Sequence, residues 1–344
     1  MSKTYSSIYL LKNISDMSSI AQIFNRSHAE LLPHVQKDKK QVENMPDSEK
    51  YFIYSWKEVS EIEEMKVPKL IFNEEDDGVL EKTIRFQKAI ANIEYTKKKR
   101  KDDNDNFLPK KERLNNSDVD VFFFEYEKRV YVLILTANEY NTRRVKLLIG
   151  DERISRSNKE YMIDSDTFNW LFYIYTDKEG IIDSSITLEN ISGFVGNVTD
   201  DANVFTGTSY QTTELIVTKA FISNGGELKN ITLRVRNSDV DLTCMINDVS
   251  TVIINDSVSQ KLRILDSLDK NAFFLLYLYS YLIPKLKQLY EEEAVQFIKE
   301  ENPKFSKRIG LEVIRSIVEK NDIVVGDFKS LLGDGLSTEE EELV

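Results

Sequence analysis

A strict alternation of apolar and polar residues over 231–246 constrains the fold more than any other feature of the sequence. Every second position is apolar in two runs, which are Ile231, Leu233 and Val235, and then Val240, Leu242, Cys244 and Ile246. A period of two places alternate side chains on opposite faces of a strand, so each run predicts a strand with one buried and one polar face. Asn237 and Ser238 separate the runs, and we expect them to form a two-residue hairpin turn. The sequence therefore predicts an antiparallel meander within residues 214–255.

This register makes two further predictions about side chains. It sets opposite charges across the hairpin, Arg236 opposite Asp239 and Arg234 opposite Asp241, and each pair would contribute about 0.2 to 1 kcal/mol. It also turns Cys244, the one cysteine of the chain, towards the interior. A buried thiol packs as a small apolar side chain, so we do not expect Cys244 to act as a nucleophile.

The length of the chain predicts more than one folded part, because single hydrophobic cores stop growing at about 250 residues and this chain has 344. Its 16 Tyr and 18 Phe supply the large apolar side chains that packed cores need, which excludes disorder for most of the chain. We expect an α+β protein in three consecutive regions. These are a mixed α/β region over 1–116, a β-rich central domain over 117–256, and a helical region over 257–344 that ends in an acidic tail.

Periodicity and residue type predict further elements along the chain. Val119–Phe124 and Val130–Leu135 are rich in β-branched and aromatic residues, and we expect them to form a hairpin whose strands are buried on both faces. Helices are expected from Asp16 to Leu32, from Val79 to Ile93 and from Asn138 to Ile149.

Residues 273–283 form the longest apolar stretch and are broken only by Ser280. A helix needs about 20 apolar residues to cross a bilayer, so we expect no membrane span. A helix that is apolar on every side is buried between other elements or in a partner interface. We expect an interface with a protein partner or with a second copy, formed by Phe273, Phe274, Leu276, Tyr277, Leu278 and Tyr281. No charged segment followed by an apolar one opens the chain at Met1, and we expect a cytoplasmic location.

Positive charge gathers in one segment of an otherwise acidic chain. Residues 97–113 carry eight basic side chains against four acidic ones, a local net charge of +4 where the whole chain has −12. The basic residues of this segment, called the basic cluster below, are Lys97, Lys98, Lys99, Arg100, Lys101, Lys110, Lys111 and Arg113. Such a cluster is typical of a phosphate contact with nucleic acid, and equally of a solvated loop, and both interpretations stay open.

The common motifs for nucleotide binding and metal binding are missing from the sequence. The glycine-rich stretch from Gly193 to Gly207 contains no lysine, so it cannot form a phosphate-binding P-loop. His28 and His34 are six residues apart around Pro33, a spacing that does not place two metal ligands on one helix face. We expect no cofactor and no bound metal.

One arrangement of carboxylates is similar to that of metal-dependent nucleases of the PD-(D/E)xK type. Asp118 and Asp120 open a strand, as the first metal-binding acid of such a site would. The next strand, however, has Ile134 and Thr136 where the Glu and Lys of the motif should stand. Only Glu139, beyond the strand end, could complete the set.

The sequence thus favours a non-enzymatic interaction subunit of an intracellular multi-protein assembly. An association with nucleic acid through the basic cluster, and a role in a bacterial or phage defence system, fit this interpretation. The alternative is a divergent or inactivated Mg-dependent nuclease that uses Asp118, Asp120 and Glu139.

Overall fold

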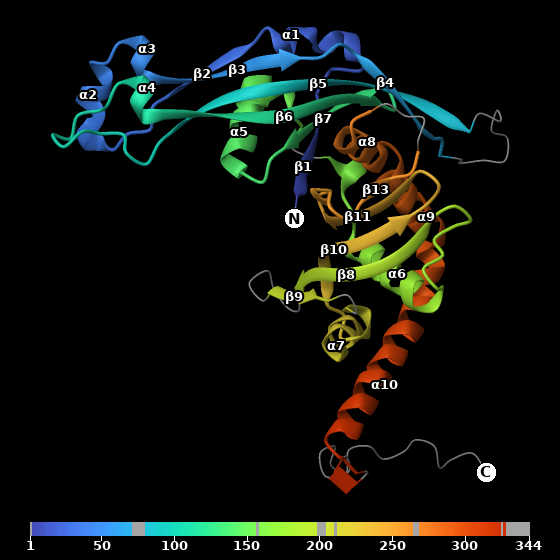
Figure 1. Ribbon diagram of the computed structural model, residues 1–344. Coiled ribbons are helices and arrows are strands. Elements are labelled where there is room, and N and C mark those ends of the chain that lie inside the picture. The colour runs from blue at the N-terminus through green and yellow to red at the C-terminus, as the bar shows by residue number, and fades with distance from the viewer. Residues whose placement is uncertain are drawn as a thin grey trace, which may run out of the picture. The chain divides into compact units, whose positions relative to one another are not determined.

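The chain folds as an α+β protein of two compact units, and each unit is assembled from two separate stretches of sequence (Figure 1). Unit 1 comprises Met1–Ile163 and Arg236–Gln288, and unit 2 comprises Asp164–Val235 and Leu289–Val344. The computed structural model describes residues 2–70, 80–155, 158–197, 204–209, 212–263, 268–324 and 326–327. The units do not follow the three consecutive regions expected from the sequence, because residues 236–288 belong with the N-terminal part of the chain.

A single antiparallel sheet is the centre of unit 1. Its strand order is β2-β3-β5-β6-β7-β1-β12-β11, while β4 pairs with β5 and β13 pairs with β11. The strands are β1 (Lys3–Leu10), β2 (Ser27–Leu31), β3 (Tyr51–Val59), β4 (Glu63–Pro68), β5 (Glu81–Thr96), β6 (Leu114–Tyr126), β7 (Arg129–Leu135), β11 (Val240–Asn247), β12 (Val252–Asn255) and β13 (Gln260–Lys261).

Mostly short helices join these strands. The helices of unit 1 are η1 (Met17–Ile20), α1 (Ala21–Phe24), η2 (Gln36–Asp38), α2 (Lys39–Glu43), α3 (Asp47–Lys50), α4 (Lys110–Arg113), α5 (Glu139–Ile149), η3 (Asp151–Arg153), η4 (Lys159–Tyr161), α8 (Lys270–Tyr277) and the π-helix η6 (Leu278–Leu282). The boundary between the units falls within the next helix, α9 (Ile283–Gln296).

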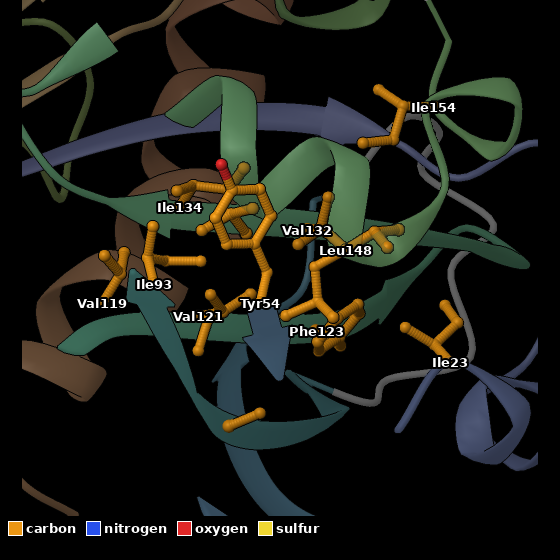
Figure 2. Packing of buried hydrophobic residues seen from close by; sticks show 14 of the residues in the cluster. Ile23, Tyr54, Ile93, Val119, Val121, Phe123, Val132, Ile134, Leu148 and Ile154 are labelled. Carbon is orange, nitrogen blue, oxygen red and sulfur yellow. The ribbon is translucent and has the colours of Figure 1, made fainter. Parts of the chain in front are cut away.

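The main core of unit 1 lies between the sheet and α5. Val121 and Phe123 of β6 and Val132 of β7 point to this side and pack with Tyr54 of β3 and Leu148 of α5 (Figure 2). The hairpin predicted over 119–135 is confirmed, and its two strands are buried on both faces as expected. The helix predicted over 138–149 is confirmed as α5, whose first turn is capped by the Asn138 side chain.

Of two helices predicted in the N-terminal part, one is wrong and the other is shorter than predicted. Residues 81–96 form the long strand β5, which pairs with β6 from Phe86 to Thr96. The apolar residues of this segment fit a period of two as well as a helical period, and pairing with the neighbouring strands decides between them. The helix that Asp16 caps ends at Phe24, and β2 occupies Ser27–Leu31.

The turn of the predicted meander is shifted by one residue. The Asn237 amide donates to the Val240 carbonyl at 2.9 Å, so Ser238 and Asp239 are the loop residues and Arg236 is not opposite Asp239. The Asn237 side chain accepts from the amides of Asp239 and Val240, which fixes Asn237 as the first residue of the turn. Helix α7 (Ile216–Ser223) occupies the first part of the expected meander, and β10 (Glu227–Arg236), β11 and β12 follow it.

The described residues of unit 2 form three strands and several helices. Strand β8 lies between β9 and β10, and the pair β8–β9 is antiparallel. Helices α7 and α10 lie side by side (Figure 1), joined by an ion pair of 2.8 Å between Lys219 and Glu312. The elements are α6 (Ser165–Asp177), β8 (Thr187–Asn197), β9 (Val204–Thr208), η5 (Thr212–Glu214), α7 (Ile216–Ser223), β10 (Glu227–Arg236), the π-helix η7 (Phe297–Glu301) and α10 (Asn302–Lys320).

Candidate functional sites

Three residues of the basic cluster are held by ion pairs or hydrogen bonds within unit 1. Lys101 binds Asp38 of η2 at 2.7 Å, and Lys110 binds Glu94 of β5 at 2.8 Å. The fully buried Arg113 donates through Nε to the Leu108 carbonyl at 2.9 Å and through its guanidinium to the Glu49 carbonyl. These three side chains fix the loop against η2, α3 and β5. They are structural residues and are not available to a ligand.

The other five basic side chains leave a smaller charged surface. Lys99 lies 3.9 Å from Asp103, an exposed pair that contributes little. Four cations of the cluster have no carboxylate within 4.0 Å among the residues that the structure describes, and they are Lys97, Lys98, Arg100 and Lys111. The basic cluster predicted from the sequence is therefore reduced to four unpaired cations on a well-anchored loop.

The carboxylates of the alternative nuclease site do not converge. Asp118 binds Lys57 at 2.6 Å and Asn92 at 2.7 Å, and the hydrogen bond from Lys57, more than that from Asn92, holds the pKa of Asp118 below its usual value. Asp120 lies 3.3 Å from Lys88. Both acids alternate with Val119 and Val121, so they point away from the face that α5 covers.

Glu139, the third acid of that alternative, opens α5 and therefore lies on the opposite side of the sheet from Asp120. Asp118 and Asp120 each form an ion pair with a neighbouring lysine. Within the described part of the chain, no three His, Cys, Asp or Glu side chains lie together as ligands of a metal ion would.

The apolar stretch after residue 272 is core and not an interface. The six residues predicted to meet a partner are all buried by the chain itself: Phe273, Phe274, Leu276, Tyr277, Leu278 and Tyr281. Phe273 stacks on Tyr277 with ring centres 5.7 Å apart. The hydroxyl of Tyr277 accepts a hydrogen bond of 2.6 Å from the side-chain amide of Asn237. An all-round apolar helix fits both kinds of burial, and only the surrounding elements decide between them. None of the described helices is long and apolar enough to cross a membrane.

An exposed apolar surface lies instead on α10, outside the segment predicted to meet a partner. Leu311, Ile314 and Ile317 are 56%, 50% and 44% exposed, and we call them the apolar stripe. Phe305, Ile309 and Val313 form the buried face of the same helix. The sequence signal for this surface is that α10 carries apolar residues on a second face in addition to the face that packs into the core.

A cavity of about 640 Å³ lies within unit 1 between strand β1 and helix α5. We call it the α5 cavity. Its lining brings together residues that are distant in the sequence, namely Tyr5, Ser7, Tyr9, Thr136, Ala137, Glu139, Thr142, Arg143, Lys146, Leu147, Asp151, Asn247 and Thr251. A sequence signal is lacking because these residues come from three segments that are 96 or more positions apart. Of the predicted site residues, Glu139 alone lines this cavity.

Comparisons with known proteins do not assign the chain to a family. No protein-family model matches the sequence, and no curated protein matches it. Among solved structures, the chain is weakly similar to a protein described as the di-domain ARO/CYC StfQ from the steffimycin biosynthetic pathway. The two chains are 10% identical, the alignment covers 90% of this chain and 96% of the other, and the TM-score is 0.14. A likeness of this size carries no inference about fold or function.

Proposed function

We propose that this chain is a non-enzymatic interaction subunit of an intracellular multi-protein assembly, and that it contacts nucleic acid through its basic cluster. The apolar stripe of α10 is the observation that carries the proposal. Large apolar side chains exposed in a row along a helix are typical of surfaces that another protein covers. The chain's rich supply of Asn, Ile and Lys fits an AT-rich genome, and we extend the proposal to accessory proteins of bacterial or phage defence systems.

The charge of α10 indicates which partner would fit the stripe. The helix has two acidic residues, Glu312 and Glu319, against five basic ones, Lys304, Lys307, Arg308, Arg315 and Lys320. An amphipathic helix of this kind docks into a hydrophobic groove, and opposite charge at the rim of the groove raises the association rate. We therefore expect a protein partner with an apolar groove and an acidic rim.

The test changes the stripe without touching the core. The double variant Leu311→Asp with Ile314→Asp is compared with Val295→Asp, which alters a similarly exposed apolar residue of α9 outside the stripe. In purification from the native cells, wild type and the Val295 variant should retain the same partner, and the stripe variant should lose it. Its free energy of unfolding should stay within about 0.5 kcal/mol of wild type, as exposed substitutions usually do.

A stripe variant that keeps its partner in full would contradict the proposal. Sedimentation of the purified chain separates the two kinds of occupant, because a second copy gives a concentration-dependent mass that the stripe variant abolishes. A heterologous partner leaves the purified chain monomeric in both forms.

The nucleic-acid contact is proposed on the four unpaired cations. Each lysine or arginine that contacts a phosphate releases counterions, so binding weakens as salt rises. Changing Lys98, Arg100 and Lys111 to Ala should weaken binding of a short single-stranded DNA and reduce the slope of log K against log salt by about 0.7 for each phosphate that is no longer neutralised. Lys39→Ala is the matched control, because Lys39 is an exposed lysine of α2 outside the cluster. An unchanged slope in the triple variant would show that the loop is only solvated.

A further inference from the structure

The α5 cavity has a floor and a wall that come from regular elements. Tyr5, Ser7 and Tyr9 point into it from one face of β1, since Ser6 and Ile8 are buried on the other face. The wall is one side of α5, and the end of β7 and the turn between β11 and β12 complete the lining. All these segments belong to unit 1. A volume of about 640 Å³ lies within the range of small-molecule sites, about 300 to 1,000 Å³.

Charges along the wall follow an order that favours an anion in the middle. Glu139 opens α5 and Asp151 follows its end, so the two carboxylates lie at opposite ends of the cavity. Arg143 and Lys146 lie between them on one helix face, three positions apart, so their Cβ atoms are about 5 to 6 Å apart. Two adjacent cations suit a single anionic group, and the separated carboxylates repel a ligand whose negative charge extends along the cavity.

Lys146 is the unpaired cation of this pair. Its Nζ lies 4.2 Å from the centre of the Tyr9 ring, and no carboxylate lies within 4.0 Å of it among the residues that the structure describes. Arg143 binds Glu30 at 2.5 Å through one terminal nitrogen, and makes no other hydrogen bond within the described chain. Both cations therefore keep donors for a ligand, at a place where Tyr5, Ser7 and Thr142 add hydroxyl groups.

From this geometry we propose that the α5 cavity binds a small organic phosphomonoester of nucleotide size, with its phosphate on Lys146 and Arg143. The guanidinium and ammonium groups supply charge-assisted hydrogen bonds to the phosphate oxygens. The ring of Tyr5 and the hydroxyls of β1 face the organic part. Glu139 and Asp151 select for one phosphate group over a polyphosphate. This site is independent of the apolar stripe and of the basic cluster.

The test measures binding to the full chain by calorimetry with four probes, which are adenosine 5′-monophosphate, ribose 5-phosphate, adenosine and adenosine triphosphate. The two monophosphates should bind, adenosine should not, and the triphosphate should bind more weakly than the monophosphate. Lys146→Gln should weaken monophosphate binding roughly ten- to a hundredfold, the range expected for hydrogen bonds to a charged group. Lys128→Gln, which removes an exposed lysine outside the cavity, should leave the affinity unchanged.

Several results would overturn the proposal. Absence of saturable monophosphate binding to the wild-type chain at millimolar concentration is one, and unchanged affinity in Lys146→Gln is another. Preference for the triphosphate would refute the role of Glu139 and Asp151. Loss of binding in the triple variant of Lys98, Arg100 and Lys111 would place the phosphate on the basic cluster instead. Failure of ribose 5-phosphate to bind where the nucleotide binds would refute the phosphate as the group that the site recognises.

Discussion

The hydroxyl of Tyr161 donates a hydrogen bond of 2.7 Å to the main-chain carbonyl of Tyr279, inside the π-helix that follows α8. The hydroxyl of Tyr279 in turn donates to the Ser250 carbonyl at 2.8 Å, and the Ser250 hydroxyl donates to the Tyr161 carbonyl. The three residues thus close a ring of buried hydrogen bonds that joins η4, the β11–β12 turn and the π-helix. The i→i+5 hydrogen bonding of a π-helix differs from that of an α-helix, and the Tyr161 hydroxyl bonds a carbonyl within this π-helix.

Removing the Tyr161 hydroxyl should destabilise unit 1. Tyr161→Phe keeps the ring but leaves the buried Tyr279 carbonyl without this donor, and we expect the free energy of unfolding to fall by about 1 to 3 kcal/mol. Denaturant titration measures the change. Tyr140→Phe is the matched control because Tyr140 is 72% exposed, and it should change the stability by less than about 0.5 kcal/mol. Equal stability in the two variants would mean that the ring of hydrogen bonds contributes nothing.

The thiol of Cys244 should be unreactive in the folded protein. Cys244 is buried as the sequence predicts, and this burial raises the pKa of its thiol to about 12. Since the thiolate is the reactive form, a thiol reagent at about pH 8 should label the chain only after unfolding in guanidinium. Mass spectrometry of both samples gives the labelled fraction. Complete labelling without denaturant would show that β11 opens readily or that Cys244 is exposed.

Leu276 should behave as a core residue. Its side chain is fully buried, so Leu276→Ala removes packed methyl groups and should lower the free energy of unfolding by about 2 to 5 kcal/mol. Leu311→Ala makes the same chemical change on the exposed apolar stripe and should cost less than about 0.5 kcal/mol. Thermal and denaturant unfolding measure both. A Leu276 variant of wild-type stability that failed to bind a partner would restore this segment as an interface.

Arg113 should matter for folding and not for nucleic-acid binding as such. Arg113→Ala leaves the Leu108 and Glu49 carbonyls without their donor and should cost about 2 to 4 kcal/mol. Lys111→Ala, two residues away and exposed, should leave stability unchanged within about 0.5 kcal/mol. Denaturant unfolding curves of the Arg113 and Lys111 variants measure the two changes in stability. An Arg113 variant that is fully stable but fails to bind DNA would reverse this assignment.

The contribution of Glu30 to stability should depend on pH. Burial alone would raise the pKa of Glu30, but hydrogen bonds from Arg143 and Tyr54 outweigh it and hold the pKa below the ordinary value of about 4.5. A lowered folded-state pKa gives stability that is present above about pH 4.5 and is lost as the pH falls through the folded-state pKa. We therefore expect Glu30→Gln to be less stable than wild type by about 1 kcal/mol at neutral pH.

The same comparison in acid provides the contrast. The difference between wild type and Glu30→Gln should shrink towards zero as the pH falls below the folded-state pKa, because Glu30 is then protonated in both states. Denaturant titrations across the acid range follow the difference. A difference that stays constant with pH would show that Glu30 contributes through packing and not through its charge.

Regular local patterns of residue type allowed parts of the fold to be predicted. The β6–β7 hairpin follows from dense β-branched and aromatic residues, and helix α5 follows from its spacing and its capping Asn138. The inward position of Cys244 follows from strict alternation. In each case residue type or periodicity within the segment favours one structure, so no distant residue is needed to choose it. The turn at Asn237 shows the limit, because a side chain to main-chain hydrogen bond shifted it by one position.

What the sequence by itself determined is therefore local: the α+β class, the strands with one clear period, and the segments too apolar to remain exposed. The tertiary structure decided everything that depends on residues far apart in the chain. Pairing with β6 made β5 a strand. Lys101 was a candidate phosphate contact, but it binds Asp38, which is 63 positions away in the sequence, and so it holds the loop in place. The α5 cavity likewise exists only because β1, α5 and the β11–β12 turn meet in unit 1. Hydrogen bonds and ion pairs between such distant residues leave no periodic trace in the sequence, so only the folded chain reveals them.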